Sequence, residues 1–304
     1  MPLRPLWRLA GGRSLDTSRP LVMGILNVTP DSFSDGGELS GDPARVLALA
    51  HAMVEAGAAL LDVGGESTRP GAAFVGADEE LRRVLPVIEA LVRELPVPIS
   101  VDTRKASVAR AALAAGAAIV NDVSGLAHDP AMGEVAARAE AGLVLMHMRG
   151  EPATMMEHAR YQDVVREVAR ELASAIAKAR AAGVSDAAIV VDPGVGFAKT
   201  AEHSLTLIHR LGELGALGRP ILVGPSRKSF LGRILDVPPG ERVAGTVAAC
   251  VAAYREGARI FRVHDVLPVV QALRVAEAIA RERVPEAFAS PAAGRGPSLG
   301  APAR

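Results

Sequence analysis

Eight short apolar runs recur along this chain, and nearly every one ends in a residue that can carry chemistry. Stretches with helical apolar spacing separate the runs, which predicts parallel strands joined by crossover helices. Eight such units predict an α/β fold of the (β/α)8 TIM-barrel type, whose active site lies at the carboxyl ends of the strands. The runs end in, or lead into, Asn27, Asp62, Asp102, Asn121 with Asp122, His147, Asp192, Ser226 to Lys228, and Arg262 with His264. We therefore expect these side chains to meet at one mouth.

The chain length fits one domain of this kind. A (β/α)8 barrel needs about 250 residues, and the chain has 304. Residues 1–19 mix Pro, Gly and Arg without periodicity and predict an arm or short hairpin, and residues 20–283 are expected to form the barrel. Residues 284–304 are rich in Pro, Ala and Gly and predict a disordered tail.

Composition excludes several classes of protein. The formal net charge is zero and aromatic residues make up 3% of the chain, which argues against a nucleic-acid surface. The single cysteine, Cys250, lies in a helical run and is expected to be a small buried hydrophobe rather than a nucleophile. No apolar stretch reaches the roughly 18 residues of a spanning helix, and no signal-peptide core is present. We expect a cytoplasmic protein.

Start signals place several helices. One is expected over residues 42–57, with Asp42 as its N-cap, Pro43 at its first position and Gly57 at its end. The next begins near Asp78 with acidic residues in its first turn. Four more helices follow in the crossovers up to about residue 218, and two complete the ring after residue 240.

Two Gly- and Pro-rich loops follow the first two strands. They span residues 27–37 and 64–72, and their composition is typical of either a solvated turn or a lid that closes over a substrate. Because the two loops follow adjacent strands, we favour the lid. Arg69 in the second loop offers a planar donor fork for a carboxylate.

Three strands end in polar residues, namely Asp102, Asn121 and Asp192. Buried carboxylates are costly unless they are paired or bind a ligand. Salt bridges to local cations (Arg104, Lys105 and Lys199) are one interpretation, and a metal site is another. A third is a flat heterocycle with an amino group beside a ring N–H, as in guanine or pterin, because carboxylates accept paired hydrogen bonds. His147 is expected to pack in the barrel, and Met146 to give such a heterocycle an apolar face.

The last two strands lead into GPSRKS, residues 224–229, and FRVHD, residues 261–265. Barrels of this type often bind phosphate in this region. Arg262 and His264 are two apart on one predicted strand and are expected to project to the same side. With Asn27 on the neighbouring strand they are predicted to hold a phosphate or its magnesium ion, which prefers oxygen ligands and keeps several waters.

Eight motifs occur in an order that resembles one family. GILNVTPDSFSDGG, DVGGESTRPGA, SVDTRK, IVNDVSG, LMHMRG, DPGVGFAKT, GPSRKSFLG and RVHDV, between about residues 20 and 280, are similar to those of the dihydropteroate synthases. The resemblance implies a magnesium-dependent transferase of folate biosynthesis. It would join 6-hydroxymethyl-dihydropterin diphosphate to p-aminobenzoate, releasing diphosphate. The resemblance also implies a homodimer and sensitivity to sulfonamides, which mimic p-aminobenzoate.

The resemblance implies a role for each matched residue. The pterin would be bound by Asp102, Asn121, Met146, Asp192, Phe197, Gly224, Lys228 and Arg262. The diphosphate would be held by Asn27, Arg262 and His264, with Asn27 as the magnesium ligand. The p-aminobenzoate would contact Phe33, Thr68, Arg69, Pro70 and Ser226. Catalysis would involve Asp102, Asp35 and Lys228.

Two related functions stay open at this point. A pterin-binding methyltransferase shares the barrel and the pterin-binding positions, but transfers a methyl group to a corrinoid protein. It needs neither the residues that bind the diphosphate nor both loops. A non-catalytic pterin-binding paralogue would keep the pocket without turnover. The chain departs from the usual family pattern at Gly76, Glu151 and Met156, which lie at the predicted rim.

Overall fold

Eight parallel strands form a closed ring. The computed structural model describes residues 6–28, 43–68 and 71–283 of the chain. Within them the strands pair in the order β8-β7-β6-β5-β4-β3-β10-β9, and an isolated parallel bridge between Val191 and Ile221 joins β8 to β9. The strands are β3 Leu21–Asn27, β4 Leu60–Gly64, β5 Ile99–Asp102, β6 Ile119–Asp122, β7 Gly142–Met146, β8 Ile189–Asp192, β9 Leu222–Val223 and β10 Ile260–Val263. The predicted (β/α)8 barrel is confirmed.

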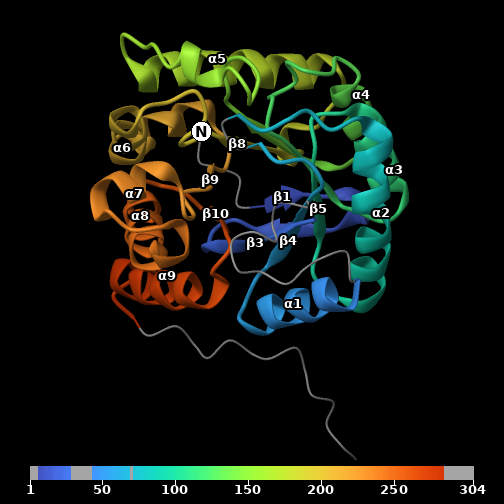
Figure 1. Ribbon diagram of the computed structural model, residues 1–304, viewed down its shortest axis with the longest axis horizontal. Helices are drawn as coiled ribbons and strands as arrows, with labels where there is room; N and C mark the ends of the chain where they lie inside the picture. Colours follow the sequence, from blue (N-terminus) through green and yellow to red (C-terminus); the bar gives the residue numbers. More distant parts are fainter. Residues whose placement is uncertain (1–5, 29–42, 69–70, 284–304) are drawn as a thin grey trace, which may run out of the picture.

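Helices surround the ring in chain order, from α1 at the bottom of Figure 1 through α5 at the top to α9 at the lower left. They are α1 Pro43–Glu55, α2 Ala77–Glu94, α3 Ala106–Ala114, α4 Met132–Arg138, α5 Val164–Ala181, α6 Ala201–His209, α7 Ser229–Leu235, α8 Val243–Arg255 and α9 Val266–Ala280. The first begins at Pro43 as predicted, whereas its expected cap, Asp42, lies outside the described residues. Gly57 follows that helix with a φ of +100°, which favours glycine.

One helix was missed from sequence. The seven-residue helix α7 follows the predicted phosphate loop directly, and Gly232 lies near its centre. Glycine lowers helix propensity, so the segment shows no local helical signal. Its helical form depends on packing, because Phe230 and Leu231 are buried against the rest of the barrel.

Two apolar cores fill the protein. The larger lies between the sheet and the helices and takes in residues from most of the elements. The smaller lies inside the ring and contains Trp7, Leu9, Met23, Leu60, Ala118, Ile119, Val144, Val190, Leu222 and Ile260. The barrel is therefore packed with side chains at this level rather than open along its axis.

An N-terminal hairpin closes one end of the barrel. β1 Leu6–Arg8 pairs antiparallel with β2 Ser14–Asp16, and the side chain of Trp7 in β1 is fully buried. The Trp7 indole donates a hydrogen bond of 2.7 Å to the carbonyl oxygen of Ala188, the residue before β8. The hairpin thus seals the amino-terminal ends of the strands, opposite the mouth at their carboxyl ends.

No helix in the described part of the chain is long and apolar enough to cross a membrane. Cys250 is fully buried in α8, and burial raises the pKa of its thiol. A protonated, inaccessible thiol is a packing group, as expected from sequence.

Replacing Trp7 with Ala should destabilise the barrel by about 3–5 kcal/mol. The substitution leaves a cavity where the indole closes the amino-terminal end of the barrel, and it removes the indole hydrogen bond. Urea unfolding monitored by circular dichroism measures the change. Leu6 on the same strand is 52% exposed, so Leu6→Ala is the matched control and should change stability by less than about 0.5 kcal/mol. Equal effects of the two variants would contradict the role of Trp7 in closing the end of the barrel.

Candidate active site

A polar layer lies directly above the apolar interior of the barrel. Side chains two apart on a strand point to the same face, so each inward apolar residue predicts the direction of the residue two positions on. From Leu60, Ile119, Val144, Val190, Leu222 and Ile260 this rule leads to Asp62, Asn121, Met146, Asp192, Gly224 and Arg262. On β5, Ser100 lies beside Ile119 and Asp102 beside Asn121 in the strand register. The predicted pterin residues on the strands therefore share one level at the mouth.

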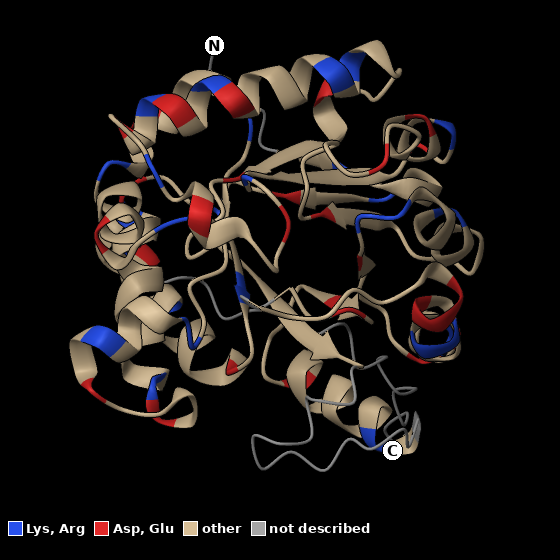
Figure 2. Ribbon diagram, turned by 45° about the horizontal axis from the view of Figure 1, so that its top comes forward, with Lys and Arg blue, Asp and Glu red and all other residues tan. Residues whose placement is uncertain are grey.

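Arg262 connects three strands at this level. Its Nε donates to Oδ2 of Asp62 and its Nη2 to Oδ2 of Asp102, both at 2.6 Å. Asn121 donates from Nδ2 to the same Asp62 oxygen at 3.0 Å. Figure 2 shows acidic and basic residues on the strands and loops around the centre of the ring. The side chains thus form one hydrogen-bonded cluster across the barrel.

Burial shifts the pKa of Asp102 in this cluster. Desolvation raises the pKa of Asp102 to about 7, although the Arg262 cation opposes the shift. The neighbouring carboxylates of Asp62, Glu80 and Glu66 add to the rise. Near neutral pH, Asp102 therefore exchanges readily between a carboxylate that accepts hydrogen bonds and an acid that donates one.

Asp192 and Lys228 carry opposite charges that attract each other at another side of the mouth. The Asp192 carboxylate is buried and accepts a 2.7 Å hydrogen bond from the amide of Gly194. The Lys228 ammonium donates to the carbonyl oxygen of Val195 and lies 4.4 Å from the centroid of the Phe197 ring. Burial lowers the pKa of Lys228 to about 8, and attraction to Asp192 opposes that shift. This side of the mouth offers an aromatic face, a cation and a carboxylate.

The ends of β3, β9 and β10 form the third part of the site. Ser226 Oγ lies 3.0 Å from Nδ1 of His264, and it accepts a 3.2 Å hydrogen bond from the His264 amide. Gly64 lies between Asn27 and Asp102. A Cβ on this glycine would lie 3.7 Å from Oδ1 of Asn27 and 3.5 Å from Cβ of Asp102. The missing side chain leaves room between the amide and the carboxylate.

Arg227, next to Ser226, pairs with Asp265 through two hydrogen bonds of 2.7 and 3.0 Å. Its guanidinium is thus held by the carboxylate of Asp265, the residue before α9.

The local cations do not pair with the strand-end carboxylates. Lys105 binds Glu66 at 2.7 Å and Glu80 at 2.5 Å, and Arg104 binds Glu66 at 3.2 Å. Lys199 contacts His147 instead. The salt-bridge interpretation is therefore wrong for these cations, because the cation that neutralises Asp102 is Arg262 from the opposite side of the barrel.

A metal held by clustered carboxylates is not supported either. The residues that the structure describes contain no group of three or more His, Cys, Asp or Glu side chains that could hold a metal ion. The Arg262 guanidinium already supplies the positive charge between Asp62 and Asp102.

Four predicted site residues (Phe33, Asp35, Arg69 and Pro70) lie outside the described residues. Thr68 is half-buried at the end of the stretch 43–68. One polar-layer residue, Asp62, was noted at a strand end but not assigned to the site. It is fully buried, and its Oδ1 has no hydrogen-bond partner among residues 6–28, 43–68 and 71–283. The sequence feature that could have identified Asp62 as a site residue is its position as the only acid in the apolar run ALLDVGG, two residues after Leu60.

Replacing Arg262 with Met should destabilise the protein by about 3–5 kcal/mol, because two buried carboxyls lose their cation. Without Arg262 the pKa of Asp102 rises further, so the folded protein takes up a proton more readily than the unfolded chain. The loss should therefore be larger at pH 8 than at pH 6, which urea unfolding at both values measures.

The double variant Asp62→Asn with Arg262→Met is the control, since it removes one carboxylate together with the cation. It should recover part of the lost stability. A loss that does not change with pH, or no recovery in the double variant, would argue against the cluster as the cause.

Comparisons with known proteins identify the family of this chain. A family model for pterin binding enzymes matches residues 23–264. A dihydropteroate synthase of Synechocystis sp. is 52% identical over 264 residues, which cover 86% of this chain and 91% of that protein. Yersinia pestis dihydropteroate synthase in a sulfonamide drug complex superposes with a TM-score of 0.86 at 46% identity, covering 90% of this chain and 98% of that chain.

A second solved structure is Xanthomonas albilineans dihydropteroate synthase with 4-aminobenzoic acid. It has a TM-score of 0.84 at 46% identity and covers 91% of this chain and 98% of that chain. The family match runs from within β3 to just beyond β10, so it contains the polar layer. This chain therefore belongs to the family of pterin-binding enzymes, among the dihydropteroate synthases.

Proposed function

We propose that this protein condenses 6-hydroxymethyl-7,8-dihydropterin diphosphate with p-aminobenzoate, giving 7,8-dihydropteroate and diphosphate in folate biosynthesis. The observation that carries the proposal is the buried cluster of carboxylates, amide and cations at the mouth of the barrel. Relatives that are about half identical over most of their length are dihydropteroate synthases. The protein is thus a transferase that moves a pterin-methylene group.

The pterin would lie in the polar layer. Its ring N–H and amino groups are paired donors that suit the carboxylates and the amide there. Met146 and the Phe197 ring would cover its apolar faces, Gly224 would let the ring approach the backbone, and the Arg262 guanidinium would stack on it. The remaining polar contacts are assigned to Asp102, Asn121, Asp192 and Lys228.

The diphosphate would lie over β3 and β10, held by Asn27, Arg262 and His264. A magnesium ion fits at Asn27, because its amide oxygen faces the space left by Gly64 and magnesium accepts a single protein oxygen together with substrate oxygens and water. When bound, the ion would neutralise charge on the leaving diphosphate. The side chain of Asn27 would orient it.

The p-aminobenzoate would bind at the rim. Phe33, Thr68, Arg69 and Pro70 of the two loops are assigned to it, and Ser226 to its carboxylate. The Xanthomonas albilineans enzyme has been solved with this compound. Sulfonamides imitate it, so they should compete with p-aminobenzoate and not with the pterin.

The reaction needs no protein nucleophile. The methylene C–O bond breaks with its electron pair going to the diphosphate, the amine nitrogen forms the new C–N bond, and that nitrogen then loses a proton. Positive charge develops on the pterin methylene, which the Asp102 carboxylate would offset electrostatically. Asp35 and Lys228 are the other residues assigned to catalysis, and the buried Cys250 takes no part.

The assay that tests the proposal contains pterin diphosphate, labelled p-aminobenzoate and magnesium. Labelled dihydropteroate should form. Asp192→Ala should weaken pterin binding by a few kcal/mol, because the ring's donors lose their acceptor. Arg69→Ala should raise the KM for p-aminobenzoate by about tenfold or more, the value of one charged hydrogen bond, and leave pterin binding nearly unchanged.

Arg180→Ala is the control, since Arg180 pairs with Asp186 on the surface. It should leave both substrates unaffected. Pterin binding without any labelled product would favour a binding module, and equal losses for both substrates in Arg69→Ala would refute separate subsites.

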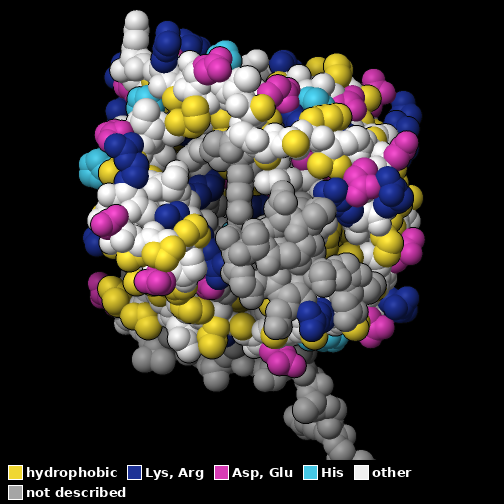
Figure 3. Space-filling view, in the orientation of Figure 1, with side chains coloured by type: hydrophobic (Ala, Val, Ile, Leu, Met, Phe, Trp, Pro, Cys, Tyr) yellow, Lys and Arg dark blue, Asp and Glu magenta, His cyan; other side chains and the backbone are white. Residues whose placement is uncertain are grey.

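The homodimer is also a proposal. Large apolar side chains are exposed on α7 and α9, including Ile234 at 57% and Ile279 at 72%, and hydrophobic side chains show over these helices on the left of Figure 3. Patches of this kind are typical of interfaces. The cytoplasmic location stays a prediction of the sequence.

Light scattering should give a mass about twice that of the 31.5 kDa chain. Changing both Ile234 and Ile279 to Glu should halve it, because two buried charges would oppose the interface. Met156→Glu, at an exposed position in the short 3-10 helix Met155–His158, should not. A wild-type monomer would exclude the dimer.

A further inference from the structure

The buried side chain of Lys199 joins two strand-end loops behind the candidate pterin site. Its Nζ lies 2.9 Å from the carbonyl oxygen of Phe197, 2.9 Å from Nδ1 of His147 and 3.4 Å from the carbonyl oxygen of His147. A protonated lysine carries three donors, and three acceptors surround it. Burial lowers the pKa of Lys199 to about 7, and attraction to Asp192 opposes that shift. The amino group thus ties the loop after β8 to the end of β7.

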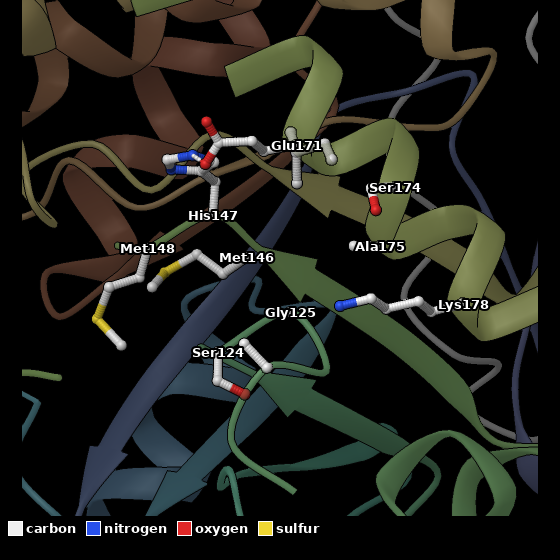
Figure 4. Close-up of a pocket in the computed structure, with 11 residues that line it drawn as sticks. Ser124, Gly125, Met146, His147, Met148, Glu171, Ser174, Ala175 and Lys178 are labelled. Carbon is white, nitrogen blue, oxygen red and sulfur yellow. Dashed lines mark hydrogen bonds and ion pairs between the residues drawn. The ribbon is translucent and has the colours of Figure 1, made fainter. Parts of the chain in front are cut away.

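The hydrogen bonds of His147 fix its tautomer. Nδ1 accepts from Lys199, so the proton resides on Nε2, which donates to Glu171 Oε2 at 3.0 Å. Burial and the Lys199 charge lower the pKa of His147 to about 4, which keeps the ring neutral. Arg149 holds Glu171 in turn. Figure 4 shows the His147 ring and the Glu171 carboxylate side by side.

The loop 193–199 holds one residue in a strained backbone conformation. Ala198 has a φ of +48°, which non-glycine residues rarely adopt, whereas Gly194 and Gly196 have φ of +66° and +81°, which glycine adopts readily. A side chain at Gly194 would collide with the carbonyl oxygen of His147. Tyr161 donates to the Ala198 carbonyl oxygen at 3.1 Å. Tertiary contacts must therefore maintain this loop.

The same loop presents groups of the candidate pterin site. Its Val195 carbonyl accepts from Lys228, and its Phe197 ring lies under the Lys228 ammonium. The backbone of Asp192, where the loop begins, is held by a 2.9 Å hydrogen bond from the His147 amide. A shift of the loop would displace the aromatic face and the cation together.

We propose that Lys199 is a positioning residue: through the neutral ring of His147 and the Phe197 carbonyl it holds the strained loop 193–199 in the shape that binds the pterin. The inference rests on the proposed function for the identity of the ligand. Lys199 is the last residue of this loop, and its amino group contacts His147 and the Phe197 carbonyl, so it would not touch the substrate. Its effect should therefore fall on pterin affinity and spare p-aminobenzoate, whose assigned residues lie on other loops.

Lys178 supplies a matched control. A cavity of about 220 Å³ lies on the far side of His147, between α5 and the loops after β6 and β7. His147 and Glu171 lie at one end of it and Lys178 on the opposite side (Figure 4). Lys178 is exposed and lies outside the loop contacts described above, so the same substitution there changes charge without removing a loop contact.

The test measures pterin diphosphate affinity by calorimetry, the KM of both substrates, and Tm. Lys199→Met should weaken pterin affinity about tenfold, or 1.4 kcal/mol, with the KM for p-aminobenzoate changed less than twofold. Lys178→Met should match the wild type. Tyr161→Phe, which removes the hydrogen bond to the Ala198 carbonyl, should shift pterin affinity in the same direction.

Unchanged pterin affinity in Lys199→Met, or equal losses for both substrates, would overturn the proposal. If that variant does not fold, Lys199→Gln, whose amide keeps N–H donors without the charge, gives the same comparison. Failure of both to fold would also overturn it, since the lysine would then support the whole barrel. Because affinity is measured without p-aminobenzoate, a wild type that binds pterin but makes no product would refute the proposed function and leave this test intact.

Discussion

One guanidinium, that of Arg262, lies between two carboxylates that come from other strands of the barrel, and the site is organised around this contact. Asp62 and Asp102 lie more than 150 positions away in the chain, yet both accept from Arg262 at 2.6 Å. Burying these charges costs folding free energy that an apolar layer of similar volume would avoid. A chain that retains such a cluster trades stability for a site ready to receive a polar ligand.

The barrel tolerates this loss of stability because packing and ligand binding lie at opposite ends of it. The hairpin around Trp7 and the inward apolar side chains fill the amino-terminal end and supply packing. The polar layer starts only one inward position further along the strands, so it rests on a rigid floor. Stability and ligand binding therefore reside at different levels of the same strands.

Support for the site comes from buried charges behind it. Glu66, Glu80, Arg104 and Lys105 form one ionic group where the loop after β4 leaves the barrel. At the end of the loop after β8, Lys199 contacts His147 in a second buried group. In each place a lysine of low exposure satisfies its donors with groups from two or three elements, which fixes loops whose own sequences are rich in glycine.

Much of this protein was readable in the sequence. Strand–helix alternation determined the barrel, and the residue at each strand end determined the composition of the mouth, because alternation is a local property of the backbone. The sequence did not predict which charged side chains form ion pairs with each other. Arg104, Lys105 and Lys199 are near the strand-end acids in sequence but pair elsewhere, and Arg262 reaches them from the far side of the ring. The helix α7 and the role of Asp62 likewise emerged only on folding. Charge pairing depends on distance in space, and ring closure alone decides which distant strands become neighbours.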